Sequence, residues 1–163
     1  MFLWFAAGSV AIVWLVFQSP AVDYRMVVLG SVLAVGEVPF GVGPLQTLAL
    51  SVVILAVVML ATIGRRLVRR RWLGVPIGTF LHLVLDGSWA RTNVFWWPAN
   101  GWRFPGISAP TVSRGLWSVA LELGGVLIAV WLWDRFGLSD ASRRRRFVTT
   151  GQLDREFMGS GRE

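Results

Sequence analysis

The chain has 163 residues, a length that fits one domain. Hydrophobic residues make up 55% of it and charged residues only 15%, so the composition indicates a membrane protein rather than a soluble domain. The formal net charge is +7, and all 16 basic residues are Arg. The absence of Cys excludes disulfides, thiolate zinc sites and iron–sulfur clusters.

The first half of the chain contains three apolar segments. Residues 2–17 form an apolar run without a preceding positive charge or a good cleavage site, so we expect a retained, short membrane helix rather than a signal peptide. Residues 26–42 begin apolar and then contain Glu37 among Pro and Gly, and they form either a span, which we favour, or a re-entrant segment. Residues 45–63 are apolar except for Gln46, Thr47, Ser51 and Thr62, with a helical length of about 28 Å that suits a bilayer.

Two Arg-rich segments orient these helices. Residues 64–71 read GRRLVRRR, and the polar tail over residues 134–163 contains a second run at 143–146. Basic segments next to spans stay on the cytoplasmic side, so both are predicted to be cytoplasmic. We interpret these runs as topology signals rather than a nucleic-acid surface, and the basic tail is placed to bind anionic lipid headgroups.

Two further spans are expected, over residues 72–89 and 116–133. The loop that joins them, residues 90–115, is rich in Trp, Pro and Gly, as is typical of an interfacial belt, although substrate stacking is an alternative. The predicted fold is therefore all-α, a polytopic transmembrane helix bundle of about five spans over residues 1–133. It lies in the cytoplasmic (inner) membrane, with its N-terminus outside and its C-terminus in the cytoplasm.

The few polar side chains within the predicted spans all fall in the outer leaflet. His82 and Asp86 share one helix face because they are four residues apart. Glu37 and Glu122 lie in the outer parts of the second and last spans, and Gln46 begins the third. Because polar groups at membrane depth face the bundle interior, we expect these side chains to converge.

Two interpretations of this cluster stay open. In one, His82 and Asp86 bind a divalent metal, zinc or manganese, and Glu37 or Glu122 is a third ligand or a catalytic base for activated water. In the other, the same groups pair with one another and hold the helices in place. The single His of the chain favours the second, since most catalytic zinc sites use two or three.

Residues 82–98 carry a resemblance to a known family. The pattern HLVLD at residues 82–86, followed by FWWP at 95–98, resembles the closing motif of the bacterial membrane-bound metal-dependent hydrolase family. The run GRRLVRRRWLGVPIGTFLHLVLDG is similar to small actinobacterial integral membrane proteins of uncharacterised function that are related to it. The resemblance covers roughly residues 23–102 and implies a metal-hydrolase ancestry.

The chain departs from that family at the other ligand positions. Residues 33–36 stand where the family has a Pro-Asp pair, with only Glu37 nearby, and Gln46 stands where a His is expected. Gln is a poor metal ligand, so the resemblance implies a degenerate site that retains His82 and Asp86.

The sequence therefore favours an integral membrane protein with a relict His/carboxylate cluster that binds a lipid or a membrane-protein partner, or associates as a homo-oligomer. The alternative is a metal-dependent hydrolase that acts on a lipid-linked substrate at the outer leaflet. Arg91 and Trp97 in the loop are the candidate ligand-binding residues, with Arg91 suited to holding a phosphate. Whether the chain is an enzyme stays open at this point.

Overall fold

The computed structural model describes residues 1–19, 22–36, 43–102 and 115–152, and this part of the chain is all-helical, as predicted. The longer helices are α1 (Phe2–Phe17), α2 (Tyr24–Leu33), α3 (Leu48–Ala61), α4 (Arg66–Trp72), α5 (Gly74–Asp86), α8 (Leu116–Arg135) and α9 (Ala141–Thr150). Three short elements, η2 (Pro44–Gln46), η3 (Ser88–Ala90) and α6 (Thr92–Phe95), lie between them.

Helix length separates α8 from the other apolar helices. Within the described ranges, α8 is the one helix that is long and apolar enough to cross a membrane. The apolar helices Phe2–Phe17, Tyr24–Gly36 and Leu48–Ala61 are shorter. The described part of the chain is thus helical, with one helix of membrane-spanning length.

Some predicted boundaries differ from the structure for local reasons. The Arg-rich segment at residues 64–71, which was predicted as a cytoplasmic connection, contains helix α4. This helix ends at Trp72, and α5 begins two residues later at Gly74. Helix α5 ends at Asp86, earlier than predicted, because Gly87 adopts the left-handed conformation with φ 66° that terminates helices. The predicted loop starts with η3 and α6, and its residues 103–114 lie outside the described ranges. The basic tail contains α9, whose first turn is capped by the carboxylate of Asp140.

Helices α2 and α5 make the closest contact in the fold. A Cβ added to Gly30 of α2 would overlap the backbone carbonyl of Val75, and one added to Gly78 of α5 would overlap the carbonyl of Val27. Small residues let two helix backbones approach each other in this way, which is how helices pack in the absence of a strong hydrophobic drive.

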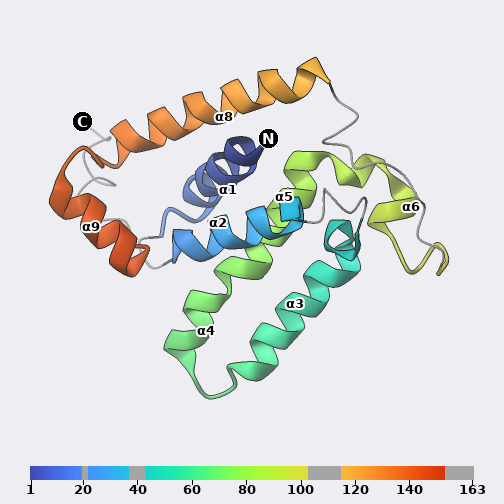
Figure 1. The fold of residues 1–163 in the computed structure, drawn as a ribbon. Coiled ribbons are helices and arrows are strands. Elements are labelled where there is room, and N and C mark those ends of the chain that lie inside the picture. The colour runs from blue at the N-terminus through green and yellow to red at the C-terminus, as the bar shows by residue number, and fades with distance from the viewer. Residues whose placement is uncertain (20–21, 37–42, 103–114, 153–163) are drawn as a thin grey trace.

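Helix α1 lies between this pair and α8 (Figure 1). Gly125 of α8 faces the backbone of Trp4 so closely that an added Cβ would overlap the Trp4 nitrogen. The buried core follows from this arrangement, with Phe5 and Val13 of α1 and Tyr24 and Val27 of α2 almost fully buried. Helix α3 instead packs mainly along α5 and buries only Ser51.

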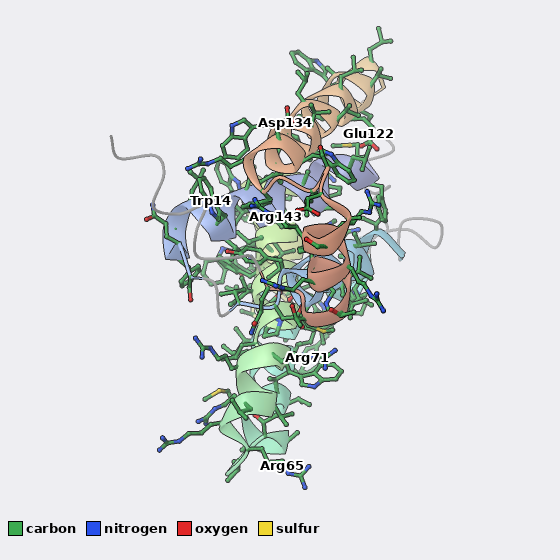
Figure 2. The ribbon with its side chains drawn as sticks, turned by 90° about the vertical axis from the view of Figure 1, so that its left-hand side faces the viewer. Trp14, Arg65, Arg71, Glu122, Asp134 and Arg143 are labelled. Atoms are coloured by element: carbon green, nitrogen blue, oxygen red, sulfur yellow. The ribbon has the colours of Figure 1, made fainter. Side chains whose placement is uncertain are left out.

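Both Arg-rich segments lie at the end of the molecule where α2 begins. Arg71 of α4 forms an ion pair with Asp23, the N-cap of α2. From α9, the Val148 carbonyl accepts a hydrogen bond from Nη1 of Arg25, at 2.6 Å, and the next turn provides the Gly151 carbonyl for the backbone N–H of Tyr24. Figure 2 shows Arg65 and Arg71 toward the bottom of the view and Glu122 near the top.

Candidate functional site

His82 joins three helices. Its Nδ1 lies 2.8 Å from the backbone carbonyl oxygen of Ser31 in α2, and its ring packs on Phe5 of α1 with 4.1 Å between centroids. A carbonyl oxygen only accepts, so Nδ1 carries a hydrogen and the neutral ring keeps its lone pair on Nε2. The side chain is 1% exposed, so these contacts replace the water it would otherwise bind.

Asp86 lies one turn further along the same helix and is equally buried. Its Oδ2 accepts a hydrogen bond from the Ser88 hydroxyl at 2.9 Å. The left-handed turn at Gly87 reverses the chain and brings that hydroxyl back to the carboxylate. Asp86 therefore stabilises the end of α5 as well as lying on the His82 face.

Glu122 of α8 caps a helix that has no side-chain cap of its own. Its Oε1 accepts a hydrogen bond from the backbone N–H of Leu3 at 3.1 Å, and its Oε2 lies 3.3 Å from the Met1 amine. The first N–H groups of a helix have no partner within the helix, and its N-terminus carries a partial positive charge. The carboxylate satisfies both and so ties α8 to α1.

The first turns of α1 bring the two ends of the predicted cluster near one another. Leu3 contacts Glu122, Phe5 contacts His82, and the indole N–H of Trp4 donates to the Leu85 carbonyl at 3.4 Å. In the part of the chain that the structure describes, His82 and Glu122 therefore share a neighbour, the start of α1, but no hydrogen bond or ion pair joins their two side chains directly.

A metal centre would need more ligands than these contacts provide. Among the residues that the structure describes, no three His, Asp or Glu side chains lie close enough together to hold a metal ion. Gln46 is buried at the end of η2, just before α3, and Glu37, the predicted further ligand or base, lies outside the described residues. Among the described residues, His82, Asp86 and Glu122 therefore do not form a three-ligand group, and we derive no step through a metal.

The two predicted ligand-binding residues lie beyond α5. Arg91 follows η3, and its Nη1 is buried without a hydrogen-bond partner in the described part of the chain. Trp97 donates from its indole N–H to the Trp102 carbonyl at 3.4 Å, and the two rings meet edge to face. Trp96 is half exposed and Trp102 is 83% exposed.

The structure adds an ionic cluster that the sequence analysis missed. Asp23 is 5% exposed, and its carboxylate accepts hydrogen bonds from Nε and Nη2 of Arg25 and lies 3.2 Å from Nε of Arg71. In the sequence, Asp23 reads only as part of a short polar link. The sequence feature that could have indicated this cluster is an N-cap carboxylate followed by Arg, at a helix end expected on the same side of the membrane as the cytoplasmic Arg run.

Comparison with protein-family models, curated protein sequences and solved structures gives no match for this chain. The class therefore rests on the fold and the contacts: the described residues form an all-helical protein with one helix of membrane-spanning length, in which buried polar side chains join the helices.

Proposed function

We propose that this chain is a multi-pass protein of the cytoplasmic membrane that binds lipid or a membrane partner and does not catalyse a reaction. The observation that carries this proposal is the use of the predicted site residues. His82 and Glu122 each join one helix to another, and Asp86 secures a helix end. Intramembrane polar groups used in this way hold a bundle together.

The exposed apolar surface supports the membrane location. Helices α3 and α8 bury few of their side chains and expose many large apolar ones, a surface that water disfavours and acyl chains accept. The exposed set includes Val52, Val53, Val57 and Leu60 on α3 and Val119, Leu123, Leu127 and Val130 on α8. Spans as short as α1 are accommodated by local thinning of the bilayer.

Cysteine labelling tests the proposed topology, because the native chain has no Cys. Asn93→Cys places a thiol in the proposed outer loop, and Ser142→Cys places one in α9 on the proposed cytoplasmic side, both at exposed positions. A membrane-impermeant maleimide should label the first in intact cells and the second only after permeabilisation. Equal labelling of both in intact cells would contradict the proposal.

The alternative proposal is a metal-dependent hydrolase that acts on a lipid-linked substrate at the outer leaflet. One observation favours it: a hydrogen bond from one ring nitrogen of His82 to a carbonyl is the arrangement that orients a metal-ligating imidazole. In that proposal His82 and Asp86 bind the metal, Glu37 or Glu122 is a further ligand or base, and Arg91 holds the anion, with Trp97 beside it. The resemblance at residues 82–98 is its other support.

Metal analysis of purified protein distinguishes the two proposals. Stoichiometric zinc or manganese that is lost in His82→Ala supports the hydrolase. Protein that is free of divalent metal and keeps its melting temperature in a chelator supports the non-catalytic role. Asp86→Asn should reproduce the metal result of His82→Ala only if both residues are ligands.

A further inference from the structure

A polar pocket of about 270 Å³ lies at the Arg-rich end of the molecule, between the start of α2, α4 and the end of α9. It is remote from His82, Asp86 and Glu122, and nothing in the proposed function uses it. Its polar lining consists mainly of Asp23, Arg25, Arg70, Arg71, Thr149 and Thr150. Three guanidinium groups face a single carboxylate there, so the pocket has an excess of positive charge.

The hydrogen bonds of the pocket separate occupied Arg groups from available ones. Arg25 is occupied, because its Nε and Nη2 bind Asp23 and its Nη1 binds the Val148 carbonyl. Nε of Arg71 lies 3.2 Å from Oδ2 of Asp23, and the two terminal nitrogens of Arg71 make no hydrogen bond with a described residue. Arg70 makes no hydrogen bond or ion pair with any described residue. The positive charge that Asp23 leaves uncompensated is therefore concentrated on α4.

We propose that this pocket binds a phosphate group through Arg70 and Arg71. The planar guanidinium matches phosphate oxygens in a two-pronged geometry, and such charge-assisted bonds are among the strongest in proteins. Asp23 holds the Arg71 side chain in place before the ligand arrives, which lowers the ordering cost of binding. The phosphate belongs to an anionic lipid headgroup or to a soluble phosphate; the chemistry is shared.

The inference that the phosphate belongs to a lipid rests on the proposed membrane function, whereas the inference that the pocket binds phosphate does not. If α4 and α9 lie at the cytoplasmic surface of the membrane, then the pocket opens at the depth of lipid headgroups, where basic residues attract anionic lipids. A phosphate monoester, with its greater charge, should bind more tightly than the zwitterionic headgroup of phosphatidylcholine.

Calorimetric titration of the full-length protein in a non-ionic detergent tests the proposal. The three probes are dioctanoyl phosphatidic acid, dioctanoyl phosphatidylcholine and inorganic phosphate. The variant is Arg70→Gln, and its matched control is Arg66→Gln, the same charge change on the same helix but outside the pocket. Losing one charge-assisted pair should weaken phosphatidic acid binding about tenfold in Arg70→Gln, and Arg66→Gln should change it less than about twofold.

Each result has one meaning. Phosphatidic acid binding that depends on Arg70 supports the site with lipid as the source, and the same dependence with inorganic phosphate supports the site with a soluble source. Equal losses in Arg66→Gln and Arg70→Gln, or no preference for phosphatidic acid or inorganic phosphate over phosphatidylcholine, would overturn it. Circular dichroism of both variants should match the wild type, because neither side chain makes a contact that the fold requires.

Alkaline carbonate extraction separates failure of this inference from failure of the proposed function. Protein that stays in the membrane pellet but binds phosphate without dependence on Arg70 refutes the pocket alone. Protein that is released from membranes but keeps Arg70-dependent binding of inorganic phosphate refutes the membrane function and leaves the pocket standing.

Discussion

Asp23 and Arg71 are distant in the sequence, yet Oδ2 of the carboxylate lies 3.2 Å from Nε of the guanidinium. This ion pair joins the start of α2 to α4, and Arg25 extends it to α9 through the Val148 carbonyl. The nearly buried Asp23 carboxylate thus helps to link α2, α4 and α9, which are far apart in the sequence.

The first prediction concerns this carboxylate. Asp23→Asn can still cap α2 but loses its charge, so we expect the free energy of unfolding to fall by about 1–2 kcal/mol. The value is below that of a fully buried pair because the Arg71 side chain is 55% exposed. Thermal unfolding in detergent, followed by circular dichroism, measures it. Asp134→Asn, at an exposed position of α8, should change stability by less than about 0.5 kcal/mol; a loss as large as that of Asp23→Asn would argue against the ion pair.

The second prediction uses two adjacent glycines of α8 as a matched pair. A Cβ at Gly125 would overlap the backbone of Trp4, whereas one at Gly124 would meet only the Trp4 ring at an ordinary 3.5 Å. Gly125→Ala should therefore separate α8 from α1 and destabilise the protein by about 1–3 kcal/mol. Gly124→Ala should be neutral or stabilising by up to about 1 kcal/mol, since Ala favours helix. Chemical denaturation compares them, and similar values for the two would contradict the packing.

The third prediction separates the two roles considered for His82. In His82→Leu the Ser31 carbonyl loses its buried partner, which should cost about 1–3 kcal/mol of stability. If the imidazole only joins helices, a chelator should leave the melting temperature of the wild type unchanged. A chelator that lowers it as much as His82→Leu does would instead assign the stabilisation to a bound metal.

The fourth prediction concerns pH and α9. The backbone N–H of Ser142, which donates to the carboxylate of Asp140 at 2.8 Å, holds the pKa of Asp140 below its usual value. A lowered pKa in the folded state means that the cap stabilises α9 above the unfolded pKa of about 4 and is lost as the pH falls through the folded value. The protection factors of the α9 amides, measured by hydrogen exchange and corrected for the intrinsic pH dependence, should therefore fall selectively below about pH 4.

Asp140→Asn is the control for this pH dependence. The amide still caps the helix but does not titrate in this range, so the selective loss of protection at low pH should disappear from α9. A loss of protection that persists in the variant would place its origin in another group.

Patterns within a single helix were predictable from the sequence. The apolar run over residues 2–17 coincides with α1, because only the small residues Gly8 and Ser9 interrupt it and no Pro or charged residue does. The shared face of His82 and Asp86 also follows from helical spacing alone. The predicted end of α5 was wrong because Gly87, which looks like an ordinary small residue in the run, adopts a left-handed φ.

Contacts between helices were less predictable, since several use backbone atoms that any residue would supply. The partner of His82 is the Ser31 carbonyl, and that of Glu122 is the Leu3 N–H. Neither partner can be recognised in the sequence, because every residue has a backbone carbonyl and almost every residue has a backbone N–H. The ion pair of Asp23 with Arg71 was also not predictable, because it forms only when the fold brings α2 and α4 together.

The interlocked glycines of α2 and α5 have a practical consequence. The two close backbone contacts, α2 with α5 and α1 with α8, each pair a helix that precedes the exposed turn at Gly64 with a helix that follows it. Two separately expressed fragments, one carrying α1–α3 and the other α4–α9, therefore hold complementary surfaces and should reassemble after severing at that turn. The same turn is a suitable insertion point for a reporter domain, because a Cβ added at Gly64 meets no atom within 4 Å.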